Sequence, residues 1–352
     1  MLRLAFATAF LLVSLALPGA AAAWDRGRVE TFAVLPDGAS GPEGLEVDAF
    51  GNVYAATFGF TAAGSATGEG QIFVFDRHGR FERQLSVAGS SPHLLGLRFH
   101  PHTGKLLVCD FGAGQVLAVD PHTGAATPFI VLPATLPHPG GSGLNDITFD
   151  RAGNIYVSDS FQGIIWKTSG AGGEATAWVD SDLLRTTGVP PFGANGVAFN
   201  QSQTALFVAN TGNDTVVKIP VSGSPLVAGK PFVFVNSING PDGLIIDIQD
   251  RIWVVANQAD EIVVIEPTNG RVIAKLGDFG GIGPDGAPNG LLFPASLVFR
   301  GNFLFVTNLS LDLGAALADP SKRTVDSPWA AQVTTFTISR INAQLPPIQG
   351  LP

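Results

Sequence analysis

Cysteine is almost absent from this 352-residue chain, which contains only Cys109. A single thiol cannot form a disulfide within the chain, so such bonds contribute nothing to its stability. Cys109 stands in the apolar stretch "KLLVCDF". We expect it to be a small buried strand residue rather than a nucleophile, because no histidine pattern accompanies it. Stability must then come from the apolar core and from ring closure or a metal ion.

Charge is also sparse. Charged residues make up 14% of the chain, the formal net charge is −9, and Lys and Arg form no run. A surface of this kind cannot follow a phosphate backbone, which argues against a nucleic-acid partner. The acidity fits ordinary solubility as well as attraction of cations.

Long apolar runs are missing apart from one at the N-terminus. Arg3, the apolar residues 4–17 and the small residues before Trp24 have the pattern of a secretory signal. The run is shorter than the ~20 residues that span a bilayer, so a membrane anchor is disfavoured. We therefore expect a signal peptide at residues 1–23, a mature domain at 24–352, no membrane span, and a secreted or periplasmic location.

Glycine, proline and hydrophobic residues are abundant instead: 43 Gly, 25 Pro and 45% hydrophobic residues, a balance typical of a core-rich protein with many tight turns. The stretch 41–57, "GPEGLEVDAFGNVYAAT", introduces a pattern that returns five times. We define the anchor of each copy as the residue two before the first apolar residue of its first strand. The six anchors follow one another at intervals of about 50 residues; they are Glu43, Leu95, Asn145, Asn195, Asp242 and Ala295.

Each copy has a period of two and turn residues between its strands, which predicts four short strands. In the first copy we expect them at residues 45–47, 53–57, 71–76 and 81–87. Repeats of this length and content predict an all-β fold, a six-bladed β-propeller.

The ends of the chain indicate how the ring closes. The last copy supplies strands at 296–299, 303–307 and 332–338, and no fourth. The segment 28–35, "RVETFAVL", is therefore expected to be the missing outer strand of the last blade. The alternative, two three-bladed domains, would expose strand edges.

The first strand of a blade lines the central channel, so the six anchors are expected to face one another at its mouth. Four of them carry side-chain oxygens: Glu43, Asn145, Asn195 and Asp242. Each alone is explained by a turn such as Pro-Asp-Gly or Asn-Gly. Their shared register in four blades favours a metal site. Oxygen ligands without His or Cys suit calcium, and two carboxylates balance a dication, although Mg²⁺, Mn²⁺ or Zn²⁺ stays possible.

With these anchors the sequence resembles the superfamily of senescence marker protein, gluconolactonase and diisopropyl fluorophosphatase, over nearly the whole mature chain. The resemblance implies that Glu43, Asn145, Asn195 and Asp242 bind one catalytic calcium, with Asp242 as base or nucleophile beside it.

One departure from that superfamily concerns the substrate. Its sugar lactonases resemble Arg-x-Asn-Asp-Gly around the first Asn, whereas residues 143–147 here read "GLNDI". The missing arginine argues against a polar sugar lactone. The apolar anchors, with Phe192, Leu292 and Phe293 nearby, predict a more apolar pocket.

Other residues are weaker candidates for function. His93 and His138 lie in loops that enter blades two and three on the anchor side, and either could donate a proton, His93 being the stronger candidate. Packing within the loops is the alternative. His100, His102 and His122 are expected to be structural. A recurring set of strand-end residues is expected to form turns; it comprises Asp110, Asp159, Asn210, Asn257 and Asn308.

Two long loops, 58–70 and 309–331, belong to adjacent blades and to the anchor face. We expect them to fold over the channel mouth as a lid; the alternative is that they are disordered surface loops.

Two function hypotheses follow. The first is a secreted, monomeric, calcium-dependent hydrolase of a small lactone or ester, with Asp242 and His93 as catalytic residues. The second is a non-enzymatic propeller similar to NHL-type binding proteins, in which the channel metal stiffens the ring and the loops bind a partner. Strictosidine synthase-like relatives share the fold without this ligand set, so the four anchors count against them.

Overall fold

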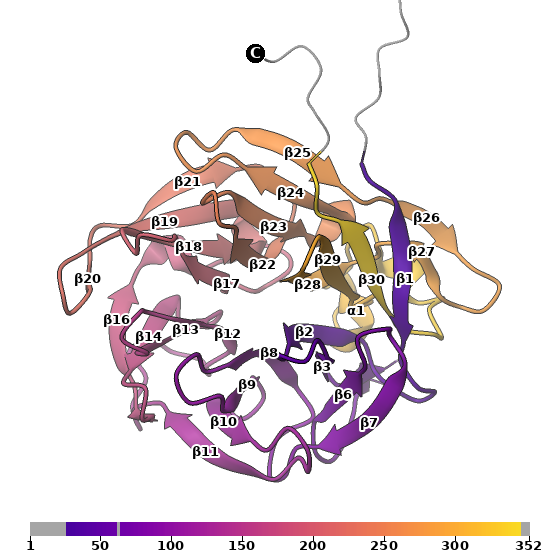
Figure 1. The fold of residues 1–352 in the computed structure, drawn as a ribbon, viewed down its shortest axis with the longest axis horizontal. Coiled ribbons are helices and arrows are strands. Elements are labelled where there is room, and N and C mark those ends of the chain that lie inside the picture. Colours follow the sequence, from indigo (N-terminus) through magenta and orange to yellow (C-terminus); the bar gives the residue numbers. More distant parts are fainter. Residues whose placement is uncertain (1–25, 62–63, 346–352) are drawn as a thin grey trace, which may run out of the picture.

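Six sheets, antiparallel except for one short parallel pair at the edge of the second, stand around a common axis in the computed structural model, which describes residues 26–61 and 64–345 (Figure 1). Each sheet begins at the axis with the strand that carries the anchor and continues outward. The predicted all-β six-bladed propeller is confirmed. The expected signal peptide lies outside the described residues. Within the described part of the chain, no helix has the length and apolarity needed to cross a membrane.

The first three blades follow the chain order. Blade one contains β2 (Pro42–Val47), β3 (Val53–Thr57), β6 (Gln71–Phe75) and β7 (Phe81–Ser86). Blade two contains β8 (Leu94–Phe99), β9 (Leu106–Asp110), β10 (Gln115–Val119) and β11 (Ala126–Val131). Blade three contains β12 (Leu144–Phe149), β13 (Ile155–Asp159), β14 (Ile164–Thr168) and β16 (Thr176–Asp180), and β15 (Gly173–Glu174) pairs with β11.

The other three blades complete the ring. Blade four contains β17 (Ala194–Phe199), β18 (Ala205–Asn210), β19 (Thr215–Ser222) and β21 (Phe232–Asn236), with β20 (Val227–Ala228) on β19. Blade five contains β22 (Pro241–Ile246), β23 (Ile252–Ala256), β24 (Glu261–Ile265) and β25 (Val272–Leu276). Blade six contains β28 (Pro294–Arg300), β29 (Phe303–Asn308), β30 (Thr337–Asn342) and β1 (Val29–Val34).

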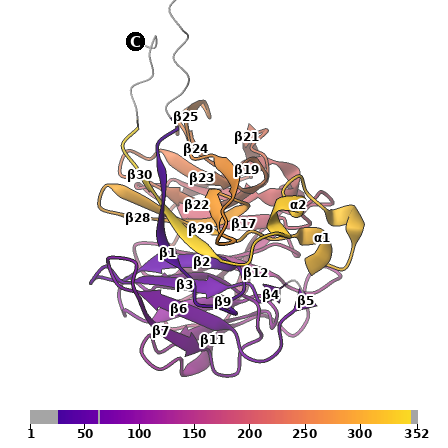
Figure 2. The ribbon, with the colours of Figure 1, turned by 90° about the vertical axis from the view of Figure 1, so that its right-hand side faces the viewer.

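Short elements lie in the connections. Two hairpins are formed by β4 (Phe60–Thr61) with β5 (Gly64–Ser65) and by β26 (Phe279–Ile282) with β27 (Pro288–Gly290). The helices are α1 (Leu313–Ala316), α2 (Ser327–Ala330) and the 3-10 turns η1 (Asp182–Leu184), η2 (Thr211–Asn213), η3 (Asn257–Ala259) and η4 (Pro320–Lys322). Figure 2 shows α1, α2, β4 and β5 on the same side of the disc.

Blade six differs from the expectation in one strand. Its third strand is β30, so the predicted bounds 332–338 are wrong. The amides of Thr334 and Thr335 donate to the carbonyl of Gly286 instead, which assigns this stretch to the connection before the strand. On the outer side of β30 lies β1, antiparallel, with Val29 opposite Ile341 and Arg340 bonded to Glu30 at 2.8 Å.

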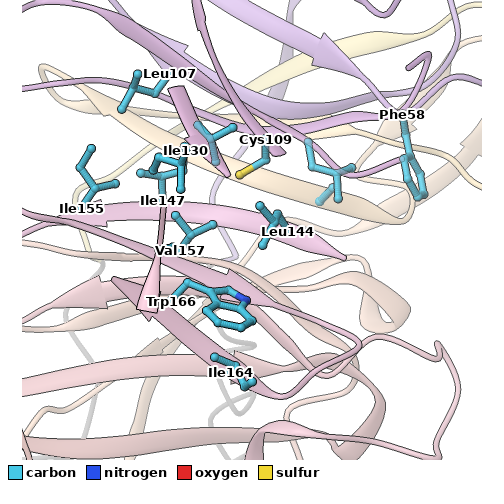
Figure 3. Close-up of a cluster of buried hydrophobic side chains, with 14 of the residues drawn as sticks. Phe58, Leu107, Cys109, Ile130, Leu144, Ile147, Ile155, Val157, Ile164 and Trp166 are labelled. Atoms are coloured by element: carbon cyan, nitrogen blue, oxygen red, sulfur yellow. The ribbon is translucent and has the colours of Figure 1, made fainter. Parts of the chain in front are cut away.

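Apolar side chains between neighbouring blades form the core. Figure 3 shows one such cluster, in which Cys109 and Ile147 of adjacent blades pack near Trp166. Cys109 is fully buried, as expected. Burying one large apolar side chain contributes roughly 1.5–3 kcal/mol. Packing between blades therefore stabilises this ring without a disulfide.

A β-bulge at the anchor occurs in all six inner strands. In blade three, Leu144 pairs with Asp159 and Ile147 with Val157, so two inner residues oppose one partner residue. The same shift follows Pro42, Leu94, Ala194, Pro241 and Pro294. Bulges redirect side chains. This backbone feature places the six anchors on equivalent positions around the axis.

Glycine follows the anchor in four blades because the inner strands approach closely there. A Cβ added to Gly44 would lie 2.1 Å from the carbonyl oxygen of Leu95, and one added to Gly196 would lie 2.5 Å from that of Asp242. Such contacts are impossible, so these glycines allow neighbouring blades to bring their anchors together.

Candidate metal centre at the channel mouth

The four predicted ligands line one buried cavity. Glu43, Asn145, Asn195 and Asp242 are each no more than 6% exposed. The centre of a water-sized sphere can move through about 20 Å³ of this inner cavity, which is room for an ion or a water molecule. The other lining residues are Phe58, Leu95, Phe192, Asn257, Phe293, Leu309 and Leu311.

The anchors of blades three to five, which we call the polar arc, are held by hydrogen bonds from their own blades. The amide of Asn145 donates to Ser160 Oγ at 3.2 Å. The amide of Asn195 donates to Thr211 Oγ1 at 3.0 Å. Asp242 Oδ2 accepts from the amide of Asn257 at 3.0 Å. The three supporting residues occupy one equivalent position, directly after the residue that pairs across the bulge.

The hydroxyls of Ser160 and Thr211 determine which side-chain atom of Asn145 and of Asn195 is left for a ligand. Ser160 Oγ donates its proton to the carbonyl of Ala194 at 2.7 Å, and Thr211 Oγ1 donates to that of Pro241 at 2.8 Å. A hydroxyl has one proton, so each can only accept from its asparagine. The carbonyl oxygens of Asn145 and Asn195 are thereby left for a ligand.

Three buried oxygens at this cavity have no hydrogen-bond partner: Glu43 Oε2, Asp242 Oδ1 and Asn257 Oδ1. Buried polar atoms are nearly always paired, and leaving one unpaired is costly. A cation in the cavity would give the carboxylate oxygens of Glu43 and Asp242 a partner, whereas Asn257 Oδ1 faces Gly240, which does not line the cavity. Two carboxylates balance a dication, and the oxygen-only donor set fits calcium.

The same set contains only two acidic side chains. In the described ranges, no group of three or more His, Cys, Asp or Glu side chains is placed to hold a metal. An ion at the channel mouth would therefore depend on asparagine carbonyls as much as on carboxylates.

The electrostatics of the two carboxylates favour the same conclusion. Burial raises the pKa of Asp242 to about 7, although hydrogen bonds from Asn257 and Asn195 lower it. Burial, and then the charge of Asp242, raise the pKa of Glu43 well above its usual range. A cation between them would favour the charged forms and reverse both shifts.

The anchors of blades six, one and two form the apolar arc: Ala295, Glu43 and Leu95. At the position that holds Ser160, Thr211 and Asn257 in the polar arc, these blades have Leu309, Phe58 and Phe111. The rings of Phe58 and Phe111 meet edge to face at 5.6 Å, and both contact Phe192. The predicted apolar surroundings are therefore present, and Phe192 and Phe293 line the cavity, although Leu292 does not.

Asn257 is a site residue that the sequence reasoning missed. Its assignment to the register of Asp110, Asp159, Asn210 and Asn308 is wrong, because Pro241 pairs with Ala256 and Asn257 lies one residue further. The other four hold loops, as expected. Asp159 Oδ1, for example, accepts from the amide of Gly143 at 2.9 Å.

An ion pair beside the anchors was also missed. Asp146 stands where four other blades have glycine, and Arg98 Nη2 lies 3.2 Å from its carboxylate. Arg98 also donates to the carbonyl of Leu45 at 3.1 Å. The exception to the glycine pattern was the signal in the sequence that could have revealed Asp146.

The family of this chain is shown by comparison with known protein families. The family model described as SMP-30/Gluconolactonase/LRE-like region matches residues 90–277, more than half of the chain. The chain belongs to the SMP-30/gluconolactonase/LRE-like family. This confirms the resemblance inferred from the anchors. A search of curated proteins found no match.

Solved structures share the fold of this family member at low identity. A luciferin-regenerating enzyme is 16% identical with a TM-score of 0.62, covering 90% of this chain and 95% of its own. A gluconolactonase from Xanthomonas campestris is 13% identical with a TM-score of 0.61, covering 90% and 89%. The calcium-binding protein regucalcin from Agrobacterium tumefaciens is 19% identical with a TM-score of 0.59, covering 92% and 97%.

The two candidate histidines of this family member lie outside the inner cavity. His93 stacks on Phe60 at 4.6 Å, and its ring nitrogens lie 2.6 Å from the carbonyl of Phe58 and 2.9 Å from Ser65 Oγ. His138 Nε2 lies 2.8 Å from Asp180. Both rings are thus engaged in loop contacts. A catalytic role for His93 stays a prediction that the cavity lining does not support.

The two loops expected to form a lid reach the channel mouth. Phe58 begins the first loop, and Leu309 and Leu311 begin the second; all three line the inner cavity. The second loop contains α1, η4 and α2 and continues to Phe336, and the first contains the β4–β5 hairpin (Figure 2).

Proposed function

We propose that this member of the SMP-30/gluconolactonase/LRE-like family is a calcium-dependent hydrolase of lactones or esters. The observation that carries the proposal is the presence of two buried carboxylates, each with an unpartnered oxygen, at one ion-sized cavity. Membership of a family that includes gluconolactonases supports the lactone or ester bond as the target.

Four side chains would hold the ion: the carboxylates of Glu43 and Asp242, and the carbonyls of Asn145 and Asn195, with Asn257 supporting Asp242 from behind. Calcium held by these residues would supply Lewis-acid chemistry toward the carbonyl of the scissile bond. Mg²⁺, Mn²⁺ and Zn²⁺ remain to be compared with it.

Asp242 is the group best suited to handle the proton. Asn257 holds Oδ2, while Oδ1 is left without a partner at the cavity. We assign Oδ1 the proton of the attacking water, or direct attack on the carbonyl in the alternative mechanism. Phe58, Phe192 and Phe293 exclude bulk water, which strengthens electrostatic interactions in the cavity.

The test is a hydrolysis screen of the purified protein with lactones, aryl esters and phosphotriesters, in calcium and in chelator. We expect turnover of a lactone or ester in calcium and its loss in chelator. Equal rates in both conditions would overturn the metal dependence. Absence of turnover on every substrate with any of the four divalent ions would overturn the hydrolase.

A non-enzymatic binding propeller is the second candidate. The observation that favours it is the size of the inner cavity, which has room for an ion but not for an ester under its apolar cover. In that case calcium should raise the melting temperature while no substrate is turned over.

We further propose, from the sequence pattern of residues 1–23, that the protein is exported; that it works as a monomer is a separate proposal. N-terminal sequencing of the mature protein should start near Trp24, and sedimentation should give the mass of one chain. A mature protein that retains Met1 would contradict export by cleavage.

A further inference from the structure

A second, larger hollow adjoins the inner cavity under the lid loops. The centre of a water-sized sphere can move through about 230 Å³ of this outer hollow, compared with about 20 Å³ of the inner cavity. Its walls include Phe60 of the β4–β5 hairpin, Ala316 of α1, Ala330 of α2 and Val333. The outer hollow therefore has the space for organic bulk that the inner cavity lacks.

The two spaces share a wall. Leu309 and Leu311 line both the inner cavity and the outer hollow, and each is buried. Both follow β29 of blade six, and a leucine side chain is not fixed by any hydrogen bond of its own. A connection between the two spaces would require these two side chains to change rotamer.

The chemistry of the outer hollow selects its occupant. Among the described residues that line it, only Asp312 is charged, and its carboxylate caps α1 by accepting from the amide of Ala315 at 3.3 Å. The remaining walls are mainly alanine, leucine, valine and phenylalanine. A sugar would lose the hydration of its hydroxyls there, whereas an alkyl chain would gain from burial.

We propose that the outer hollow binds an alkyl chain of the substrate, so that the substrate class is a lactone or ester bearing an unbranched apolar chain. The scissile carbonyl then lies at the inner cavity, and Leu309 and Leu311 turn aside to admit the connection. This assignment rests on the proposed hydrolase function.

The first test is a series of γ-lactones from γ-butyrolactone to γ-decalactone, hydrolysed in calcium. Each methylene buried in the hollow should raise kcat/KM about fourfold. Ala316→Phe fills the hollow and should flatten this dependence. Leu317→Phe is the matched control, because Leu317 is the adjacent exposed residue of the lid and does not line the hollow. It should retain the dependence of the parent protein.

Val333→Phe fills the hollow from another segment and should act like Ala316→Phe. A folding defect in one variant therefore does not decide the result. The alkyl-chain site is overturned if kcat/KM does not depend on chain length in the parent protein. It is also overturned if Ala316→Phe and Val333→Phe both keep the chain-length dependence of the parent.

The second test measures binding without turnover. Calorimetry in chelator should detect γ-decalactone bound to the parent protein, with an affinity at least about tenfold above that for γ-butyrolactone, and Ala316→Phe should remove the difference. Binding in chelator without hydrolysis in calcium supports the hollow and overturns the proposed hydrolase. Hydrolysis with no preference for chain length overturns the hollow alone, and absence of both overturns both.

Discussion

The polar arc and the apolar arc of the channel mouth share one backbone and differ in one supporting position per blade. In the polar arc, Ser160, Thr211 and Asn257 each bond to the anchor of their blade. In the apolar arc, that position is Phe58, Phe111 or Leu309, which cannot hold a polar anchor. The same bulge therefore presents oxygen ligands on one side and an apolar wall on the other.

Glu43 makes this comparison informative, because it is the acidic anchor of the apolar arc. Its Oε2 is buried and has no partner, whereas Oδ2 of Asp242 is held by Asn257. Two carboxylates of equal charge thus differ in how firmly the protein holds them. We infer that the polar arc is preorganised for the ion and that Glu43 mainly supplies charge.

The largest expected effect is on kcat, and it should differ between substitutions of these two carboxylates. Asp242→Asn and Glu43→Gln each remove one negative charge with little change in size. Asp242→Asn should lower kcat by ~10²- to 10⁴-fold at any calcium concentration, because the basic oxygen is lost. Glu43→Gln should instead raise the calcium concentration needed for activity, and turnover should recover in excess. Calcium titrations of kcat for both variants make the comparison.

Full recovery of both variants at high calcium would mean that Asp242 is a ligand only, and that another group moves the proton. His93→Gln, tested in parallel, would then show whether that histidine contributes. If both variants lose activity at every calcium concentration, melting curves recorded with and without calcium would distinguish loss of folding from loss of catalysis.

The next effect concerns stability. Calcium at 100 times its dissociation constant should stabilise the folded protein by about 2.7 kcal/mol relative to chelator. Asn195→Leu, in the polar arc, should abolish the difference in melting temperature. Leu95→Met, in the apolar arc, should keep it, because Leu95 offers no ligand and the exchange of apolar side chains is mild. A calcium shift retained in Asn195→Leu would exclude this asparagine from the ion site.

A smaller effect, on calcium affinity, is expected when a residue that hydrogen-bonds to an anchor of the polar arc is replaced. Thr211→Val keeps the shape of the side chain but removes the hydroxyl that accepts from Asn195 and donates to Pro241. Calcium affinity should fall roughly 10- to 100-fold, as is typical when an outer-sphere partner is removed. Thr57→Val is the matched control. Thr57 is equally buried, but its hydroxyl contacts the carbonyl of Gln71 at 3.4 Å and no anchor. Unchanged affinity in Thr211→Val would show that the asparagine needs no such support.

The sequence predicted the ring because local and repeated signals agree. Period-two strands, turn residues and a recurring interval all indicate blades. The anchors were found for the same reason, since the bulge falls at the same place in every copy. What failed was one strand of blade six, where an alternating pattern also runs through the lid segment before β30.

The supporting residues could not be read in the same way. The turn between β17 and β18 is one residue longer than that between β22 and β23, so "VAN" in blade four and "VAN" in blade five do not occupy the same register. Only the strand pairing shows that Asn257 corresponds to Thr211. Contacts across blades, such as Arg98 with Asp146, depend on distances that no single repeat encodes.

The smallest expected effect lies at the boundary between the arcs, where Asp260 of blade five meets the lid. Burial, and then the charge of Asp326, raise the pKa of Asp260 to about 8, and its Oδ1 accepts from the amide of Phe293 at 2.8 Å. Burial raises the pKa of Asp326 to about 7. Both pKa values are raised in the folded state, so the folded protein holds these two protons more tightly than the unfolded chain does. Their contribution to the free energy of unfolding is therefore complete below the unfolded pKa of about 3.9, and it is lost as the pH rises through 7 and 8.

Asp260→Asn should therefore reduce the loss of unfolding free energy between about pH 5 and pH 9 by roughly 1 kcal/mol, after allowance for solvent screening and the shared charge. Denaturant unfolding in excess calcium measures it, because an ion bound at the proposed site would keep Glu43 and Asp242 charged throughout. Asp319→Asn is the control from the same lid, since hydrogen bonds with Ser321 lower the pKa of Asp319. A pH dependence that is identical in the parent protein and Asp260→Asn would show that the boundary carboxyls do not link the lid to the ring.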